Sequence, residues 1–365
     1  MSDEIILVVG ARPNFMKIAP IYKELESRGQ KLLLLHTGQH YDENMSKVFF
    51  EDLGMPSPDI YLGIGSGSHA YQTGTVMIEF EKICLERNPK LVVVVGDVNS
   101  TLACAIVSSK LGILCAHVEA GLRSFDRNMP EEINRILTDS ISDILLTPSL
   151  DGDENLLNEG IDKSKIFRVG NVMIDSLFSN LKTVENNDIA NQLSGPSEYA
   201  LVTLHRPSNV DDFDTFNRII NSIIEISTKI KIIFPIHPRT RKMAAKFNLL
   251  DHIKNSTNII LIEPVGYFDF ISLMSKSKFV MTDSGGLQEE TTALGIPCIT
   301  LRENTERPIT VSEGTNTIVG TDKDLIISTS NDILNSGGKK GQIPDLWDGK
   351  SAKRIADVLL QFERK

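Results

Sequence analysis

The sequence predicts an α/β protein of two Rossmann-like domains, each a doubly wound parallel sheet. Its 365 residues exceed the ~250–300 residues that one hydrophobic core usually organises, which favours two domains. Short, almost continuously apolar runs alternate with stretches of helical periodicity, and the same rhythm restarts after residue 170. Buried strands that alternate with helices are typical of a parallel sheet covered on both faces.

In the first series the β-branched run at residues 5–9 opens the sheet and ends in a glycine. We expect the strands at residues 5–9, 32–36, 91–95 and 114–118. Helical spacing of apolar residues predicts helices at residues 15–27, 68–86, 101–111 and 131–140.

The second series repeats this pattern. Strands are predicted at residues 200–204, 230–235, 259–262, 279–282 and 298–301, with helices at 214–227, 268–275 and 287–294. The polar stretch 180–197, which contains Gly195-Pro196, predicts a mobile surface connection. With a hinge near Gly170, the domains cover residues 1–170 and 171–350. A last helix is predicted at residues 351–364 and could pack on either domain.

Composition excludes several classes of function. The net charge of −10 argues against a protein that binds nucleic acid broadly, although a locally positive site for a small anion remains compatible with it. Four cysteines without CxxC pairs indicate buried core residues in a reducing compartment, with neither a disulfide framework nor a metal site. The acidic N-terminus enters a strand directly and the apolar runs are short, so we expect a cytoplasmic chain with no membrane segment.

The first motif is Gly10-Ala11-Arg12-Pro13, with Lys17 one turn later. A glycine lets the chain turn off the strand, and a proline suits the first turn of a helix. The helix N-terminus with two nearby cations is a natural anion site. An ordinary strand-to-helix turn with two solvated cations explains the same residues.

Three further polar positions follow buried strands of the first series. Asp97 follows Gly96 and is either an N-cap or a base aimed into the ligand site. Glu119 lies in His117-Val118-Glu119-Ala120-Gly121-Leu122-Arg123, where a structural Glu119–Arg123 pair is the alternative to function. Glu131 begins a predicted helix, and the helix dipole alone accounts for one acidic residue there.

Two motifs of the second series point to phosphate chemistry. His205-Arg206 follows a strand, where the histidine can donate to a phosphate or act as a general acid; a capping loop is the alternative. In Ser284-Gly285-Gly286 two glycines open a helix, so backbone N–H groups can approach a phosphate. Glu290 is then within reach of a sugar hydroxyl.

Taken together, these segments resemble the non-hydrolysing UDP-N-acetylglucosamine 2-epimerase family, whose GT-B fold has two facing Rossmann-like domains. The resemblance runs in consistent order from about residue 5 to residue 320. Besides the motifs above, it rests on Thr37-Gly38-Gln39-His40, Pro130-Glu131-Glu132 with Asn134-Arg135, Asn209, Gln288-Glu289-Glu290, Thr305-Glu306-Arg307-Pro308 and Glu313-Gly314-Thr315.

The resemblance implies a site and a reaction. Its catalytic residues match Asp97, Glu119, Glu131 and His205. Its UDP-binding residues match Arg12, Lys17, Ser284, Gly285, Gly286, Glu290 and Arg307, with Phe270 lining the uracil pocket. It further implies a UDP-sugar as substrate, no cofactor and no metal, a homodimer, a last helix that returns to the N-terminal domain, and supply of cell-surface polysaccharides.

Three departures bear on the substrate. Asn14 stands where the family has a glutamate, Pro207-Ser208 replaces a common Arg-Glu, and the stretch 124–129 is shorter than usual. That stretch is similar to relatives acting on UDP-2,3-diacetamido-glucuronate, so this sugar is an alternative substrate. Tyr41-Asp42 departs from the pattern of the family's allosteric site. A hydrolysing epimerase, a GT-B glycosyltransferase and a non-enzymatic nucleotide-sugar sensor are the competing functions.

Overall fold

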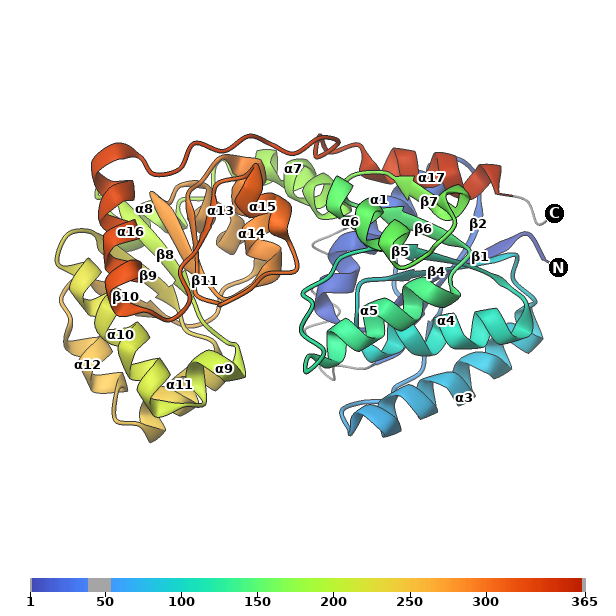
Figure 1. Cartoon of the computed structure of the whole chain (residues 1–365), viewed down its shortest axis with the longest axis horizontal. Helices are drawn as coiled ribbons and strands as arrows, with labels where there is room; N and C mark the ends of the chain where they lie inside the picture. The colour runs from blue at the N-terminus through green and yellow to red at the C-terminus, as the bar shows by residue number, and fades with distance from the viewer. Residues whose placement is uncertain (1, 39–53, 363–365) are drawn as a thin grey trace. The chain divides into compact units, whose positions relative to one another are not determined.

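The computed structural model describes residues 2–38 and 54–362 of the chain, without the side chain of Arg12 (Figure 1). The chain forms two compact units. Unit 1 comprises Met1–Ser176 and Asp345–Lys365, and unit 2 comprises Leu177–Pro344. The chain therefore leaves unit 1 once and returns to it near its C-terminus.

Unit 1 contains a seven-stranded sheet in the order β3-β2-β1-β4-β5-β6-β7, in which each strand pairs in parallel with its neighbours. Its strands are β1 (Glu4–Val9), β2 (Lys31–His36), β3 (Ile60–Tyr61), β4 (Leu91–Val95), β5 (Leu114–Val118), β6 (Ile144–Thr147) and β7 (Ile166–Arg168). Its helices are α1 (Arg12–Ser27), α3 (His69–Arg87), α4 (Asn99–Leu111), α5 (Pro130–Ile141), α6 (Leu150–Asn158) and α17 (Ser351–Gln361), with α7 (Val172–Val184) at its boundary.

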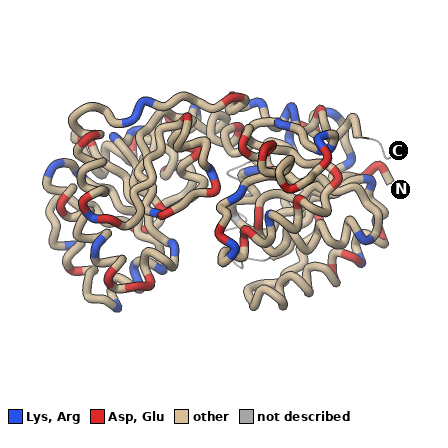
Figure 2. The backbone as a smooth tube through the Cα atoms, viewed as in Figure 1, with Lys and Arg blue, Asp and Glu red and all other residues tan. Residues whose placement is uncertain are grey.

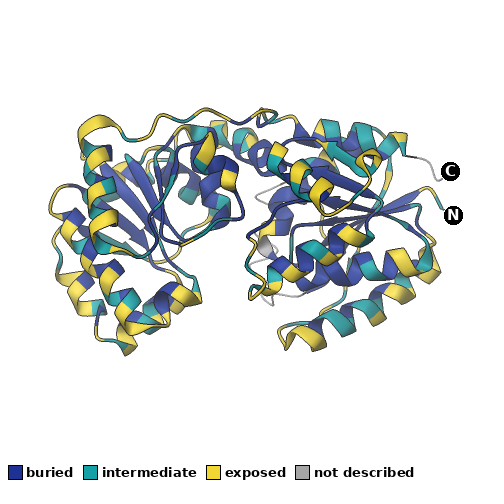
Figure 3. Ribbon diagram, viewed as in Figure 1, coloured by how far each residue is buried: buried dark blue, intermediate teal, exposed yellow. Residues whose placement is uncertain are grey.

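Both faces of this sheet are covered. Alternate strand residues such as Ile6 and Val92 pack with Phe80 of α3 and Cys104 of α4 in one core cluster. The intervening residues face the other side, where α1 packs on β1, β2 and β4. Figure 3 shows the strands as buried and the outer faces of the helices as exposed. The near-continuous apolar strands predicted from the sequence arise from this two-sided burial.

Unit 2 repeats the design with a six-stranded sheet in the order β10-β9-β8-β11-β12-β13, again with parallel pairing. Its strands are β8 (Tyr199–Thr203), β9 (Lys231–Pro235), β10 (Ile259–Ile262), β11 (Phe279–Thr282), β12 (Cys298–Thr300) and β13 (Asn316–Ile318). Its helices are α8 (Ile189–Ser194), α9 (Pro207–Val210), α10 (Phe213–Ser227), α11 (Pro238–Lys246), α12 (Leu250–Asn255), α13 (Tyr267–Ser275), α14 (Gly285–Leu294), α15 (Pro308–Ser312) and α16 (Lys323–Ser336).

The returning helix α17 is fixed to unit 1 by polar and apolar anchors. The carboxylate of Asp175 accepts the backbone N–H groups of Ser351 and Ala352 at 3.0 and 2.7 Å, which caps the start of α17. The indole of Trp347 is buried and donates to the Pro148 carbonyl at 3.0 Å. Helix α17 also packs on α1.

The predicted fold class, two Rossmann-like doubly wound parallel sheets, is confirmed by the strand orders of both units. The predicted strands and helices are all present, with ends that shift by up to three residues in most cases. The stretch 180–197, which was predicted as a polar surface connection, contains helix: α7 continues to Val184 and α8 forms a further helix there. Their short apolar faces, interrupted by asparagines, gave too weak a periodic signal. The mobility of this stretch stays a prediction.

Each sheet has a switch point where the strand order reverses, between β1 and β4 in unit 1 and between β8 and β11 in unit 2. Ligands of open α/β sheets bind beyond the strand ends at such points. The motifs at Gly10 and Gly96 follow β1 and β4, and those at His205 and Ser284 follow β8 and β11. The fold therefore places the candidate residues where each sheet can bind a ligand.

The charges and the helices of the described chain agree with the bulk composition. Figure 2 shows Lys and Arg interspersed with Asp and Glu along both units. The four cysteines are buried, as expected for core residues. Within the described ranges, the helices are all too short or too polar to cross a bilayer.

Candidate functional site

The turn between β1 and α1 is held by the side chain of Asn14. Its Oδ1 accepts the N–H groups of Gly10 and Ala11 at 3.2 and 2.9 Å, and its Nδ2 donates to the Val95 carbonyl at 3.0 Å. Asn14 thus joins the ends of β1 and β4 across the switch point. A carboxylate could not donate to Val95, so this residue makes a contact that the family's glutamate could make only when protonated.

Gly10 is required by close packing rather than by a left-handed turn. A Cβ at this position would lie 2.6 Å from Oγ of Ser100 in α4. Pro13 occupies the second position of α1, since the helix begins at Arg12. The side chain of Arg12, and the family residues Gln39, His40, Tyr41 and Asp42, lie outside the described residues.

Lys17 and Glu119 form a buried ion pair between α1 and the loop after β5. Glu119 has φ +74°, an uncommon conformation for a residue with a side chain. A Cβ on Gly96 would lie 3.3 Å from the Lys17 ammonium nitrogen, so glycine leaves room for the pair. The predicted structural alternative, a Glu119–Arg123 pair, is wrong, because Arg123 pairs with Asp139 and Glu159 instead.

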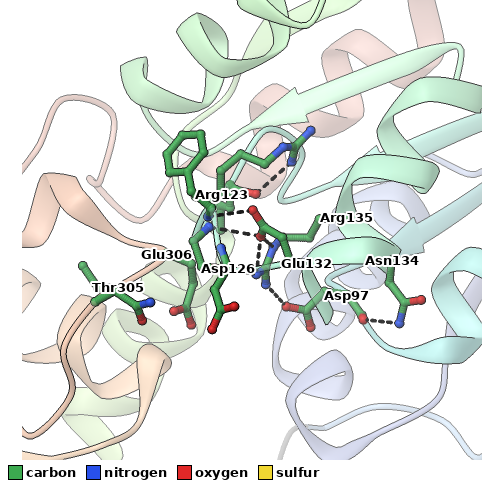
Figure 4. A network of polar contacts seen from close by, with 12 residues as sticks. Asp97, Arg123, Asp126, Glu132, Asn134, Arg135, Thr305 and Glu306 are labelled. Atoms are coloured by element: carbon green, nitrogen blue, oxygen red, sulfur yellow. Dashed lines mark hydrogen bonds and ion pairs between the residues drawn. The ribbon is translucent and has the colours of Figure 1, made fainter. Parts of the chain in front are cut away.

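Asp97 is tied to α5, as Figure 4 shows. Its carboxylate forms an ion pair with Nη1 of Arg135, and its backbone carbonyl accepts the amide of Asn134 at 2.9 Å. The alternative that Asp97 caps α4 is wrong: the N-cap is Val98. Asp97 keeps about a third of its side chain exposed, at 32%. It is therefore oriented by Arg135 while still accessible to a ligand.

The first turn of α5 does more than complement the helix dipole. The carboxylate of Glu132 accepts the N–H groups of Ser124 and Phe125 at 3.0 and 2.8 Å, and it pairs with Arg135 at 2.6 Å. Burial would raise the pKa of Glu132, but these N–H donors and the Arg135 charge outweigh it and lower the pKa below its usual value. Its neighbour Glu131 is half-buried in the same turn.

In unit 2, Asp283 at the end of β11 orients His205 at the end of β8. Its buried carboxylate lies 2.9 Å from Nδ1 of His205 and accepts the N–H groups of His205 and Arg206. The amide of Asn209 donates to the same carboxylate at 3.3 Å. Burial would raise the pKa of Asp283, but the contacts with His205 and these N–H groups lower it overall.

The glycine pair after Asp283 opens α14, with Ser284 as the N-cap residue. A Cβ on Gly285 would lie 2.4 Å from Oε1 of Glu306, whereas a Cβ on Gly286 would meet no atom within 4 Å. The two glycines thus serve different purposes: the first admits the Glu306 side chain, and the second leaves open space beside the helix N-terminus. That space suits an anion, because the first N–H groups of a helix have no acceptor within the helix.

A buried cluster of charges lies behind this turn. Arg307 pairs with Glu289 at 3.0 Å and with Glu306 at 3.2 Å, and Glu306 also pairs with Arg302 at 2.9 Å. Glu290 lies in the same helix. Burial, and secondarily the charge of Glu289, raises the pKa of Glu290 to about 8. At neutral pH its carboxyl group is mostly protonated and can both donate to and accept from a sugar hydroxyl.

Helix α13 contributes aromatic side chains to unit 2. Phe270 is partly buried near its start, and Tyr267 interacts electrostatically with Glu290. Burial, with a further contribution from Glu290, raises the pKa of Tyr267. No feature of the sequence marks Tyr267 apart from its aromatic ring one turn before Phe270.

Two residues that fix the site were given no role from the sequence. Asp283 and Asn14 each connect the two strands at a switch point, a relationship that depends on strand order and is invisible in the chain itself.

Among the described residues, no group of His, Cys, Asp or Glu is arranged to hold a metal ion.

Comparisons with known proteins identify the family of the chain. The family model described as UDP-N-acetylglucosamine 2-epimerase matches residues 23–360. A UDP-N-acetylglucosamine 2-epimerase of Methanocaldococcus jannaschii is 48% identical, over 97% of this chain and 98% of that protein. The UDP-2,3-diacetamido-2,3-dideoxy-D-glucuronate 2-epimerase of Pseudomonas aeruginosa is 41% identical, over 98% and 100%.

The fold has the same relatives. A crystal structure of M. jannaschii UDP-GlcNAc 2-epimerase in complex with UDP-GlcNAc and UDP superimposes with a TM-score of 0.90 at 46% identity, and the match covers 98% of this chain and 100% of that one. Sequence and structure agree over almost the whole length. The chain therefore belongs to the UDP-N-acetylglucosamine 2-epimerase family.

Proposed function

We propose that this chain is a non-hydrolysing UDP-N-acetylglucosamine 2-epimerase that interconverts UDP-GlcNAc and UDP-ManNAc. The observation that carries this proposal is its similarity, at 46% identity over nearly all of both chains, to an M. jannaschii epimerase crystallised with UDP-GlcNAc and UDP. The polar groups at the switch points of both sheets supply suitable chemistry.

The reaction must overcome the low acidity of the C2 proton. No carbonyl group is adjacent to C2, so direct removal of that proton is prohibitive. When the C1–O bond breaks and UDP leaves with the electron pair, C1 gains cationic character and C2–H becomes acidic. A base then takes the proton and a C1=C2 double bond forms. Re-addition of UDP at C1, with protonation of C2 from the opposite face, inverts C2.

We assign the proton transfers to the carboxylates of unit 1, Asp97, Glu119 and Glu131. Two faces of the sugar ring require two proton-transfer groups, and several carboxylates meet that need. Arg135 pairs with and orients Asp97, and Lys17 pairs with Glu119. Lys17 and Arg12 remain predicted contacts to the diphosphate.

We assign the nucleotide to unit 2. The open space at Gly286 and the N-terminus of α14 suit a phosphate, with Ser284, Gly285 and Arg307 as further predicted contacts. Glu290 is assigned to the ribose and Phe270 to the uracil. His205, whose Nδ1 faces Asp283, can present Nε2 to the departing diphosphate as a proton donor.

Incubation with UDP-GlcNAc in D₂O, followed by proton NMR, tests the reaction. We expect UDP-ManNAc to appear and deuterium to enter at C2 in both sugars. Free N-acetylmannosamine with UDP would instead indicate a hydrolysing enzyme. The Glu119→Gln variant should still bind UDP in calorimetry but lose turnover, whereas a nucleotide-sugar sensor would behave the same with or without Glu119.

UDP-2,3-diacetamido-glucuronate is the second candidate substrate, supported by the 41% identity to the P. aeruginosa enzyme and by the short stretch 124–129. Parallel incubations with both sugars at equal concentration distinguish the two. A higher kcat/KM with the uronate would reassign the substrate and leave the reaction unchanged. No incorporation of deuterium at C2 with either sugar would refute both assignments.

We also propose that the protein is a homodimer. Helix α3 exposes Tyr71, Ile78 and Leu85, which are spaced by seven residues and so fall on one side of the helix. An apolar stripe of this kind suits a second copy of the chain. Sedimentation equilibrium of the protein and of an Ile78→Lys/Leu85→Lys variant tests this: the protein should sediment as a dimer and the variant as a monomer.

A further inference from the structure

The imidazole of His117, on β5, lies fully buried between a carboxylate and a backbone carbonyl. Its Nδ1 is 2.6 Å from Oδ1 of Asp139, on α5. Its Nε2 is 2.8 Å from the carbonyl oxygen of Gly96, at the end of β4. The proposed roles of the site do not use this residue.

The hydrogen-bond partners determine which protons the ring carries. A carbonyl oxygen only accepts, so Nε2 must carry a hydrogen. Asp139 Oδ2 accepts the Gly121 N–H at 3.1 Å and lies 2.8 Å from Nη2 of Arg123. Burial would raise the pKa of Asp139, but its contacts with His117 and Arg123 lower it.

The network around His117 extends to two further charged side chains. Asp139 pairs with Arg123, and Arg123 donates to Glu159 through two contacts of 2.7 Å. Each charge in this network has a neighbour of opposite sign and hydrogen bonds, which is the condition under which buried charges are tolerated.

This network holds both loops that carry the candidate carboxylates of unit 1. Gly96, whose carbonyl binds His117, directly precedes Asp97 and has φ +71°. Gly121, whose N–H binds Asp139, lies two residues after Glu119, itself at φ +74°. Backbone conformations of this kind persist where the surroundings over-determine them.

We propose that His117 is a positioning residue for the epimerase reaction: its buried imidazole bridges Gly96 and Asp139 and so fixes the positions of the loops that carry Asp97 and Glu119. This inference rests on the proposed roles of those two carboxylates. His117 touches neither the sugar nor the nucleotide in this account, and it acts only through the two loops.

Two isosteric variants separate its two hydrogen bonds. His117→Gln places an amide nitrogen near the position of Nε2, so the donor to the Gly96 carbonyl is kept. His117→Asn places its amide nitrogen near the position of Nδ1, so the contact with Asp139 is kept and Gly96 loses its donor. Both replacements are neutral amides, and each removes one of the two contacts.

We expect the two variants to differ in turnover more than in stability. His117→Asn should lower kcat about 10- to 100-fold with little change in KM, because misplacement of a reacting group by about 1 Å can cost that much. His117→Gln should have a kcat at least about fivefold higher than that of His117→Asn, because its amide again binds the carbonyl of Gly96, the residue before Asp97. Equal kcat values for both variants, or a kcat for His117→Asn at or above that of His117→Gln, would overturn the proposal.

The hydrogen on Nε2 is tested on the unaltered protein. Nitrogen NMR of protein carrying ¹⁵N-histidine, with the His117 signal identified by its loss in His117→Gln, should show a protonated Nε2. An unprotonated Nε2 in that signal would overturn the bridge to the Gly96 carbonyl.

Failure of this inference and failure of the proposed function give different results. If Asp97→Asn and Glu119→Gln retain turnover, the roles of the two carboxylates are wrong, whatever His117 does. If both lose turnover while the two His117 variants match the unaltered enzyme, the roles stand and the positioning inference alone is refuted.

Discussion

The Nδ1 atom of His205 lies 2.9 Å from Oδ1 of Asp283, a carboxylate fully buried at the end of β11. An ionised carboxylate at this position keeps a proton on Nδ1, so Nε2 becomes the ring atom that can exchange a proton with a ligand. The same carboxylate also binds two backbone N–H groups of the loop that carries His205. Asp283 therefore sets both the tautomer and the direction of the ring.

Asp283→Asn should lower kcat of epimerisation at least about tenfold, because general acid–base catalysis contributes more than that and depends on the correct tautomer. The amide cannot accept from all of the present donors, so some loss of stability is also expected. Steady-state kinetics and thermal unfolding measure the two effects. Asp214→Asn, at an exposed position of α10, is the matched control and should leave kcat unchanged. An unchanged kcat in Asp283→Asn would remove His205 from the proton transfers.

The sequence was sufficient to predict most strands of the two sheets, because two-sided burial leaves a direct mark on it. The buried four-residue strand β6 was nevertheless missed. Runs such as residues 91–95 are apolar at each position, since each side chain meets a helix layer. Short edge elements carry no such mark. Strand β7 has three residues, none of them buried, and it was not predicted.

The candidate site residues could be selected from the sequence, but their ion-pair and hydrogen-bond partners could not. Polar residues that follow buried strands identify Asp97, Glu119 and His205 because such residues are costly unless they have a purpose. Their partners Arg135, Lys17 and Asp283 come from other elements and depend on how those elements pack. Proximity in the chain suggested Glu119–Arg123, and packing across the unit gave Lys17–Glu119 instead.

Lys17→Met should destabilise unit 1 by about 3–5 kcal/mol, because it removes one member of a buried ion pair. Denaturant unfolding can be followed by the fluorescence of Trp347, the only tryptophan, which lies in unit 1. Adding Glu119→Gln should restore more than half of the lost stability, since both charges are then gone.

Lys82→Met provides the control for this cycle. Lys82 pairs with Glu79 at 2.8 Å on the surface of α3, in the same unit, with 64% of its side chain exposed. Surface pairs of this kind contribute about 0–1 kcal/mol. If Lys17→Met costs no more than Lys82→Met, the buried pair does not hold α1 against the loop after β5.

Glu290 predicts a pH dependence of stability. Its pKa is about 8 in the folded protein against an ordinary value of 4.5, so the folded state binds the proton more tightly than the unfolded state does. The resulting stabilisation is fully present below about pH 4.5 and is lost as the pH rises through about 8, at up to about 1.4 kcal/mol per pH unit.

Glu290→Gln removes this titration and isolates it from other groups. The free energy of unfolding of the variant minus that of the unaltered protein should rise steadily between about pH 5 and pH 8 and level off above. Guanidinium titrations at several pH values measure the difference. A difference that is flat across this range would show that Glu290 is ionised at neutral pH and that its burial is compensated.

The cap that Asp175 provides for α17 predicts how the C-terminal segment is retained. Asp175→Ala leaves the N–H groups of Ser351 and Ala352 without their acceptor in a buried position, at a cost of about 1–3 kcal/mol. Because Trp347 lies four residues before Ser351 and is almost fully buried, its fluorescence reports on this segment directly. We expect the emission of the variant to shift to longer wavelength at a lower denaturant concentration than in the unaltered protein.

Glu154→Ala, at an exposed position of α6 in the same unit, should leave that midpoint unchanged. Coincident midpoints for Asp175→Ala and Glu154→Ala would mean that the buried Trp347 and the packing on α1 hold α17 without the cap.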